Sequence, residues 1–199
     1  MTHYFTRENN QLESNRQRFK CFVGGKEFIF VTDRGVFSRK GLDFGSRLLL
    51  ETILSDMKDS VLDLGCGYGP IGIILADRWN ARVTMVDVNL RALELAQINA
   101  TMNKVTPVIV ESDGMENISG KYALIVTNPP IRAGKQVFYK WFRDSARFLE
   151  DGGELVFVMK KDQGAKSAIA YLESFYANVV VRRKKSGYYI ISCQKPLTI

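Results

Sequence analysis

The chain of 199 residues is poor in histidine and cysteine. Its single histidine, His3, stands beside the amino terminus, so a Ser-His-Asp triad or a histidine-based metal site would find no histidine in the body of the fold. The three cysteines, Cys21, Cys66 and Cys193, lie far apart and form no C-x-x-C pair, which is typical of free thiols in a reducing compartment. We therefore expect chemistry that uses carboxylates, amides, backbone groups or a bound cofactor, and no metal.

Long hydrophobic runs are missing as well. The two longest, residues 71–76 and 155–159, are far shorter than the roughly 18 apolar residues of a membrane-spanning helix. The first residues, Met1 to Arg7, contain no apolar stretch of the kind that forms a signal peptide. We therefore expect a cytoplasmic protein that does not cross a membrane.

Acidic residues are fewer than basic ones. The chain has 21 Asp and Glu and 28 Lys and Arg, which gives a net charge of +7. This excess is compatible with an ordinary basic surface and also with a polyanionic partner, since Lys and Arg gain affinity by displacing phosphate counterions. The hydrophobic share of 46% and the length are typical of one globular domain. Which interpretation holds, an ordinary basic surface or a polyanionic partner, depends on where the charges lie on the fold.

From about Val61 onward, short apolar stretches typical of strands alternate with helical stretches. We expect strands at 60–64, 82–87, 108–110, 123–126 and 154–159, and helices at 70–78, after Asn89, at 137–149 and at 165–176. This alternation predicts a parallel sheet wrapped by helices. A turn is expected at 151–153, where Asp-Gly-Gly precedes a strand.

Both ends of the chain add elements to this unit. Residues 179–183 and 188–193 are joined by only four residues and must form a hairpin, so the last strand runs antiparallel to the others. Another hairpin is expected at 18–31, with its turn at Gly24-Gly25, followed by a short helix at 47–54 that Gly45 and Ser46 open. The sequence therefore predicts an open, mostly parallel α/β sheet with an antiparallel last strand.

A glycine-rich turn stands between the first strand and the first helix of the repeating unit. Its glycines, Gly65, Gly67 and Gly69, let the backbone turn sharply and approach a ligand closely, while the helix amino terminus offers unpaired N–H groups. Asp87 ends the next strand, where an acidic residue meets ribose hydroxyls in nucleoside-binding folds. Together they predict a nucleoside site. The glycine spacing and the terminal hairpin both differ from those of a dinucleotide fold.

The fourth strand ends in Asn128-Pro129-Pro130. Prolines can simply terminate a strand, but the carboxyl ends of parallel strands are also where such folds bind ligands. An Asn side-chain oxygen and a following carbonyl can each accept one N–H of an exocyclic amine, which aims the nitrogen lone pair at an electrophilic methyl group. The prolines hold that carbonyl at low entropic cost, and positioning lowers the barrier. No strong base is needed, because the nitrogen becomes acidic as it is alkylated.

On these motifs, the sequence from Phe37 to Cys193 resembles the class I S-adenosylmethionine-dependent methyltransferases. The resemblance implies a Rossmann-like seven-stranded sheet, mostly parallel with an antiparallel last strand, plus a small N-terminal β-hairpin extension. Residues 1–45 would form the hairpin and a segment covering substrate and cofactor, and residues 46–199 the catalytic domain.

The same resemblance implies S-adenosylmethionine as cofactor and assigns residues to it. The methionine moiety would lie beside Gly65 and Gly67, the ribose hydroxyls on Asp87 and the adenine near Asp113-Gly114. Asp63 would sit behind the glycines, holding the turn and the cofactor's amino group. The full set of implied cofactor residues is Asp63, Gly65, Cys66, Gly67, Gly69, Asp87, Val88, Asp113, Gly114 and Asn128.

Asn-Pro-Pro followed by an aromatic residue resembles methyltransferases that act on amino nitrogens of adenine, guanine or glutamine amides. This implies that Asn128, Pro129 and Pro130 are catalytic. Ile131 stands where the aromatic residue is expected, so stacking on the target ring must come from elsewhere, with Phe37 and Phe44 as candidates. Residues 36–46 resemble the start of the catalytic domain in RsmC-type ribosomal RNA guanine-N2 methyltransferases, whose members often carry an additional non-catalytic N-terminal half.

Basic residues follow several strands at the edge where the cofactor is expected. They stand in residues 39–40, 132–135, 160–161 and 182–185, and their convergence favours a phosphate-bearing substrate over a peptide. The residues we expect to bind substrate are Phe37, Arg39, Lys40, Phe44, Ile131, Arg132, Lys135, Lys160, Lys161, Arg183 and Lys184.

The resemblance implies methyl transfer to the exocyclic N2 of guanine in small-subunit (16S) ribosomal RNA, by direct in-line displacement without a metal or a covalent intermediate. The expected partners are ribosomal RNA or the small ribosomal subunit, and the sequence is compatible with a monomer. Adenine in nucleic acid and a protein glutamine amide stay open as acceptors. An RNA assembly factor that binds the cofactor without catalysis, and a nicotinamide-dependent oxidoreductase, are alternatives of other classes.

Overall fold

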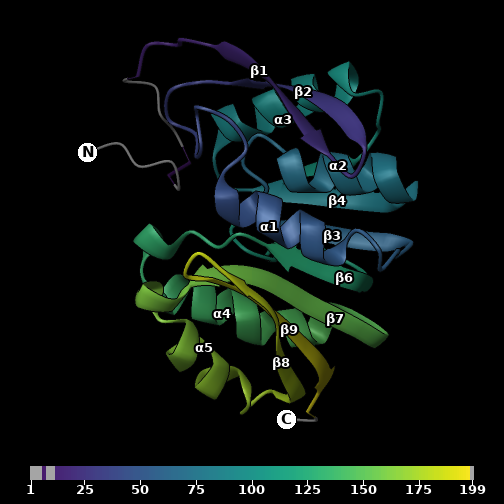
Figure 1. Cartoon of the computed structure of the whole chain (residues 1–199), viewed down its shortest axis with the longest axis vertical. Helices are drawn as coiled ribbons and strands as arrows, with labels where there is room; N and C mark the ends of the chain where they lie inside the picture. The colour runs from purple at the N-terminus through teal and green to yellow at the C-terminus, as the bar shows by residue number, and fades with distance from the viewer. Residues whose placement is uncertain (1–5, 8–11, 198–199) are drawn as a thin grey trace.

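The structure is a computed structural model that describes residues 6–7 and 12–197 (Figure 1). In chain order its strands and α-helices are β1 (Gln17–Val23), β2 (Lys26–Thr32), α1 (Phe44–Ile53), β3 (Ser60–Leu64), α2 (Pro70–Trp79), β4 (Arg82–Asp87), α3 (Leu90–Met102), β5 (Val108–Glu111), β6 (Tyr122–Thr127), α4 (Lys135–Ser145), β7 (Leu149–Lys160), α5 (Ala165–Leu172), β8 (Tyr176–Lys185) and β9 (Tyr188–Pro196). Three short 3-10 helices lie between them, η1 (Ile131–Ala133), η2 (Ala146–Phe148) and η3 (Lys161–Gln163).

The main sheet has seven strands in the order β5-β4-β3-β6-β7-β9-β8. Strands β3, β4, β5, β6 and β7 pair in parallel, whereas β9 runs antiparallel to both of its neighbours. The predicted fold, a mostly parallel sheet with an antiparallel last strand and a separate hairpin, is confirmed. Because all parallel strands have the same direction, their carboxyl ends meet at one edge of the sheet, on the left in Figure 1.

Helices cover both faces of this sheet. One apolar cluster joins α1, α2, α3 and the hairpin to one face, and a second joins α4 and α5 to the other. Successive strand residues serve opposite clusters, as in β7, where Val156 and Val158 face the first cluster and Leu155 and Phe157 the second. All five residues of β3 are buried, as expected of a parallel strand covered on both sides.

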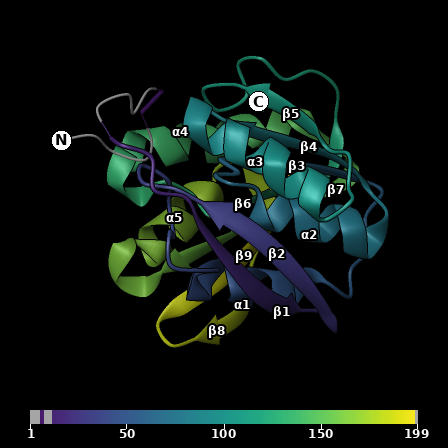
Figure 2. The ribbon, with the colours of Figure 1, turned by 90° about the horizontal axis from the view of Figure 1, so that it is seen from above.

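The N-terminal hairpin pairs β1 with β2 around Gly24 and Gly25, whose φ angles of 58° and 82° suit a tight hairpin turn. It lies against α3 (Figure 2), where two asparagine side chains bind the free edge of β2. The amide of Asn99 bonds to both backbone groups of Val31, at 2.6 and 2.9 Å, and Asn103 bonds to Ile29 in the same way. The helix thereby satisfies a strand edge that would otherwise be open.

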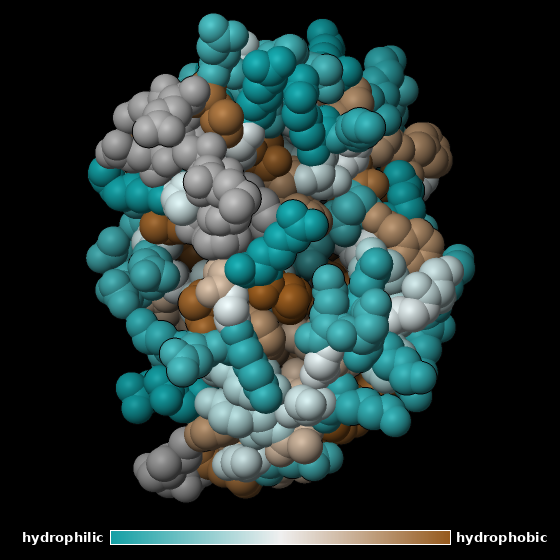
Figure 3. Space-filling view, turned by 90° about the vertical axis from the view of Figure 1, so that its left-hand side faces the viewer, coloured by the Kyte–Doolittle hydropathy of each residue, from teal (hydrophilic) through white to brown (hydrophobic). Residues whose placement is uncertain are grey.

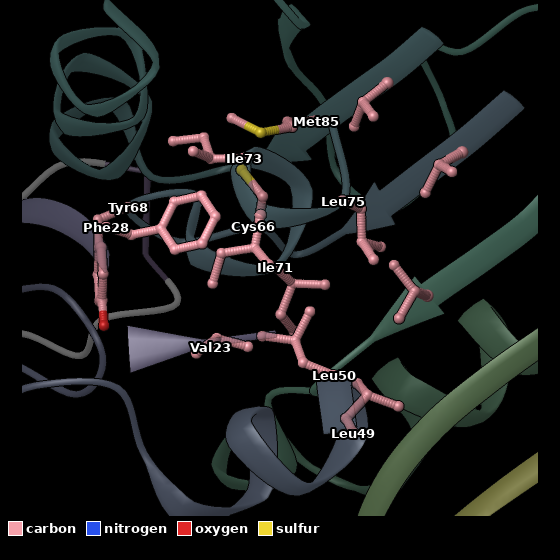
Figure 4. Close-up of a cluster of buried hydrophobic side chains, with 14 of the residues drawn as sticks. Val23, Phe28, Leu49, Leu50, Cys66, Tyr68, Ile71, Ile73, Leu75 and Met85 are labelled. Carbon is pink, nitrogen blue, oxygen red and sulfur yellow. The ribbon is translucent and has the colours of Figure 1, made fainter. Parts of the chain in front are cut away.

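The first apolar cluster lies directly beneath the glycine-rich turn. Figure 4 shows its side chains converging from the hairpin, α1, the turn, α2 and β4. Phe28 and Phe30 of β2 are completely buried, and the Phe30 ring lies 5.9 Å from the ring of Tyr68 in the turn. This packing holds the turn against the apolar core.

Several element boundaries differ from the sequence prediction. The helix expected at 47–54 spans Phe44–Ile53, and the strand expected at 179–183 spans Tyr176–Lys185. The helix expected at 165–176 ends at Leu172, because Tyr176 pairs with Pro196 in the sheet and its hydroxyl donates to the Phe142 carbonyl at 2.9 Å. The helix expected at 137–149 spans Lys135–Ser145, followed by η2. The turn expected at 151–153 is an irregularity within β7, where the register with β6 shifts and Gly152 has a φ of 77°.

Among the described residues, no helix is both long and apolar enough to span a membrane.

Candidate active site

The glycine-rich turn runs from the end of β3 to the start of α2. Gly65, Gly67 and Gly69 have φ angles of 72°, 57° and 91°, a left-handed conformation that side chains with a Cβ rarely adopt. A Cβ at Gly65 would lie only 2.9 Å from the Trp141 ring. The backbone N–H of Cys66 donates to the Val86 carbonyl at 2.8 Å, which ties the turn to β4. The turn is therefore both conformationally demanding and rigidly held.

Asp63 lies below this turn and is almost completely buried. Its Oδ2 accepts the Gly72 N–H at 2.7 Å, which ties β3 to the first turn of α2. Within the described part of the chain its Oδ1 has no hydrogen-bond partner. Burial raises the pKa of the Asp63 carboxyl to about 7, the Gly72 N–H opposes this rise, and the nearby Asp87 adds to it.

Asp87 stands at the end of β4, next to the turn. Its Oδ2 accepts the Gly67 N–H at 2.8 Å and its Oδ1 accepts the Asn89 N–H at 2.9 Å. Burial raises the pKa of this carboxyl, against the lowering effect of the N–H groups of Asn89, Gly67 and Val88. Burial also raises the pKa of the Cys66 thiol, as do the charges of Asp87 and Asp63, so Cys66 is a thiol rather than a thiolate nucleophile.

A cavity of about 620 Å³ opens at the carboxyl ends of the parallel strands, and its size suits a nucleoside cofactor together with part of a substrate. The predicted cofactor residues that line it are Gly65, Cys66, Gly67, Asp87, Val88, Asp113, Gly114 and Asn128. Asp63 and Gly69 lie beneath the lining instead. A Cβ at Gly69 would meet Ile73 at 2.9 Å and Met85 at 3.0 Å, so this glycine serves the packing of the turn.

Asn128, Pro129 and Pro130 form another part of the cavity wall. The Asn128 Nδ2 donates to the Ser46 Oγ at 3.0 Å and to the Asp43 Oδ1 at 3.3 Å. The Pro129 carbonyl accepts the Ile131 N–H at 2.9 Å, which starts η1 and turns the chain back toward α4. The predicted catalytic turn and the predicted cofactor turn thus face the same cavity.

The residues predicted to bind substrate divide into two groups. Phe37, Ile131, Arg132 and Lys160 line the cavity. Arg39, Lys40, Phe44, Lys135, Lys161, Arg183 and Lys184 lie outside the lining.

Several of the outer basic residues have partners of their own. Arg183 approaches Glu51 on α1 at 3.6 Å, and Arg182 bonds to Asp56 just beyond that helix. Lys184 lies over the Tyr189 ring at 4.9 Å. The turn between β8 and β9 nevertheless reaches the cavity edge, because the Lys161 N–H donates to the Gly187 carbonyl at 2.9 Å.

Sequence reasoning missed two kinds of cavity residue. Asp43 and Ser46 bind Asn128 across more than 80 positions of sequence, and the sequence indicated only that Ser46 opens a helix. Tyr188 and Trp141 bring aromatic rings to the lining from β9 and α4. The Tyr188 ring lies 5.2 Å from the Phe44 ring, and the Lys160 ammonium lies over it at 5.0 Å.

The face that carries these strand ends is mixed in character. Figure 3 shows apolar residues exposed near its middle, surrounded by hydrophilic side chains. Among the described residues, no group of three or more His, Cys, Asp and Glu side chains is placed to hold a metal ion.

Comparison with known proteins identifies the family. Residues 27–192 match the methyltransferase small domain family. The chain is 46% identical to the uncharacterized protein YbxB of Bacillus subtilis, over 97% of this chain and 98% of that protein. It is 42% identical to ribosomal RNA small subunit methyltransferase C of Aeromonas hydrophila, over 65% of this chain but only 38% of that protein.

A solved structure agrees with these relatives. The Thermus thermophilus 16S rRNA N2 G1207 methyltransferase RsmC, in complex with AdoMet and guanosine, superimposes with a TM-score of 0.84 at 27% identity. The alignment covers 92% of this chain and 52% of that one, so this chain spans about half of the RsmC structure. The chain therefore belongs to the methyltransferase small domain family and is a class I S-adenosylmethionine-dependent methyltransferase of the RsmC type.

Proposed function

We propose that this enzyme transfers the methyl group of S-adenosylmethionine to the exocyclic N2 of guanine in small-subunit (16S) ribosomal RNA. The observation that carries the proposal is that Asn128, Pro129 and Pro130 line the same cavity as the glycine-rich turn and Asp87. The RsmC relatives support ribosomal RNA as the substrate class. We also propose that the enzyme acts in the cytoplasm.

The cavity fits the cofactor. Gly65 and Gly67 offer close backbone approach to a methionine moiety, Asp87 stands where it can accept from ribose hydroxyls, and Asp113 and Gly114 form the side suited to adenine. Asp63 lies beneath the lining, and its buried Oδ1 lacks a partner among the described residues. We propose that this oxygen receives the cofactor's ammonium group when the cofactor is bound. When bound, the cofactor supplies an electrophilic methyl group on a sulfonium sulfur.

The chain's own task is to present the acceptor amine. The lone pair of an aromatic amine is delocalised into the ring and must be turned toward the methyl carbon. Asn128 Oδ1 and the Pro129 carbonyl, which has a second lone pair beyond its bond to Ile131, each accept one N–H of the amine. Such positioning lowers the barrier by several kcal/mol, and the proton leaves a nitrogen that has become acidic.

We propose that the rings of Phe37 and Tyr188 hold the base. They would take the role of the aromatic residue that is expected at position 131, where this chain has Ile131. Both line the cavity. Phe44, the other ring expected to stack, does not line the cavity and packs against Tyr188, with 5.2 Å between the ring centroids. A base in a duplex has to be flipped or presented unpaired to reach this position.

The RNA backbone would be bound around the cavity by basic residues. Arg132 and Lys160 stand at its lining, with Lys161 in η3 and Lys184 near the end of β8. We also propose that Arg39, Lys40, Lys135 and Arg183 contribute to the same surface. Residues 1–45 would form the N-terminal hairpin and the entry segment for substrate and cofactor, and residues 46–199 the catalytic domain; residues 1–5, 8–11 and 198–199 of these ranges lie outside the described part of the chain.

The test is methyl transfer from radiolabelled S-adenosylmethionine to unmodified small-subunit RNA and to assembled small subunits, followed by digestion and identification of the nucleosides. Asn128→Ala is expected to abolish transfer, while Asn178→Ala, a matched change outside the cavity, keeps it. Label in N2-methylguanosine supports the proposal. Label in adenosine or in a protein glutamine, or no label despite cofactor binding, would overturn it.

A further inference from the structure

The geometry points to Asp43 and Ser46 as positioning residues that fix which way the side-chain amide of Asn128 faces. The inference rests on the proposed function, because it concerns the group that is proposed to hold the acceptor amine. It adds to the site two residues from the segment that precedes and opens α1.

Both residues contact the same end of the Asn128 amide. Nδ2 lies 3.0 Å from the Ser46 Oγ and 3.3 Å from the Asp43 Oδ1. Asp43 is itself held, because it is the N-cap of α1 and its Oδ1 accepts the Ser46 N–H at 3.0 Å. Ser46 is buried, with 3% of its surface exposed, and all three residues line the cavity.

The chemistry of the pair decides the orientation of the amide. A serine hydroxyl can donate or accept, so Ser46 alone would tolerate either end of the Asn128 side chain. An ionised carboxylate only accepts, so Asp43 requires the amide nitrogen. With the nitrogen held by Asp43 and Ser46, Oδ1 is the end left for the acceptor amine, which needs an acceptor and not a second donor.

In this scheme Asn128 in the catalytic turn contacts the acceptor amine, and Asp43 at the start of α1 orients Asn128. Asp43 touches neither cofactor nor amine in this scheme and acts through Asn128. Losing a hydrogen bond to a charged group shifts such an equilibrium by roughly 10- to 100-fold. Asp43 is therefore expected to affect kcat far more than the affinity for S-adenosylmethionine.

The experiment compares four variants of the full chain. Asp43→Ser keeps an N-cap for α1 but removes the carboxylate that accepts from Asn128. Asp56→Ser is the matched control just beyond the other end of α1. Asn128→Asp places two carboxylates face to face. Asp43→Asn/Asn128→Asp exchanges the two groups, so that an amide again faces a carboxylate. For each variant, kcat, the Kd of S-adenosylmethionine and the melting temperature are measured.

We expect Asp43→Ser to lower kcat about tenfold relative to Asp56→Ser, with the Kd of S-adenosylmethionine changed less than about twofold. The exchanged double variant should be at least about tenfold faster than Asn128→Asp alone. A structural role confined to the helix cap would produce no such rescue.

The inference is overturned if Asp43→Ser has the same kcat as Asp56→Ser. It is also overturned if the double variant Asp43→Asn/Asn128→Asp is no faster than Asn128→Asp. These outcomes are separable from failure of the proposed function. If Asn128→Ala loses transfer while the exchange gives no rescue, only the orienting role fails. If Asn128→Ala keeps its rate, the catalytic role proposed for Asn128 fails, and the orienting role fails with it.

Discussion

Replacing Asp63 by Asn should change how the stability of the cofactor-free protein depends on pH. The Asp63 carboxyl is buried, has one oxygen without a partner among the described residues, and has its pKa raised to about 7 by burial. The folded state therefore keeps this proton to a higher pH than the unfolded chain, whose carboxyl titrates near 3.8. Between these values the free energy of unfolding falls as pH rises.

The size of the effect follows from the same two pKa values. Each pKa unit corresponds to about 1.4 kcal/mol, so the wild type should lose at most about 4 kcal/mol relative to Asp63→Asn between about pH 4 and pH 8. The variant stays neutral and its side-chain oxygen can still accept the Gly72 N–H. Urea unfolding at both pH values measures the difference, with Asp151→Asn as an exposed control.

Cofactor binding provides a second test of the role of Asp63. If the Asp63 carboxylate receives the cofactor's ammonium group, saturating S-adenosylmethionine at about pH 8 should stabilise the wild type more than Asp63→Asn. A stability difference between the two proteins that stays constant within about 1 kcal/mol from acid to alkaline pH would refute the reasoning about the buried charge.

Three further predictions concern the cavity wall. Gly65→Ala should cost about 1–2 kcal/mol in urea unfolding and weaken cofactor binding, because φ is 72° and the new Cβ would meet Trp141 at 2.9 Å; unchanged binding would contradict this. Tyr188→Leu should raise the KM for RNA roughly 5- to 100-fold through lost stacking and leave the Kd of S-adenosylmethionine unchanged; an unaltered KM would remove Tyr188 from the base site. Lys160→Ala should reduce the slope of log affinity for RNA against log salt by about 1, and an identical slope would exclude a phosphate contact.

Much of the fold could be predicted because it depends on local sequence patterns and on the order of strands and helices along the chain. The strands of the parallel sheet are short apolar stretches, and their positions agree with the structure to within about two residues for β3, β4 and β6. The end of the helix at Leu172 could not be predicted, because Tyr176 leaves the helical pattern for a sheet partner and a hydrogen bond to Phe142, far away in sequence.

The candidate site was predictable where one motif carries the chemistry. The glycine-rich turn, Asp87 and Asn128 each follow a strand of the same parallel sheet, so topology alone brings them to one edge. Asp43 and Tyr188 were not predictable, because their places at the cavity depend on how α1 and the last hairpin pack against that edge.

The central claim is tested most directly by mass analysis of the nucleosides in small-subunit RNA after incubation with the enzyme and S-adenosylmethionine. The account predicts one new methyl group on guanosine, at N2, formed by the wild type and Asn178→Ala and absent with Asn128→Ala. A methyl group on adenosine, or N2-methylguanosine formed equally well by Asn128→Ala, would contradict it.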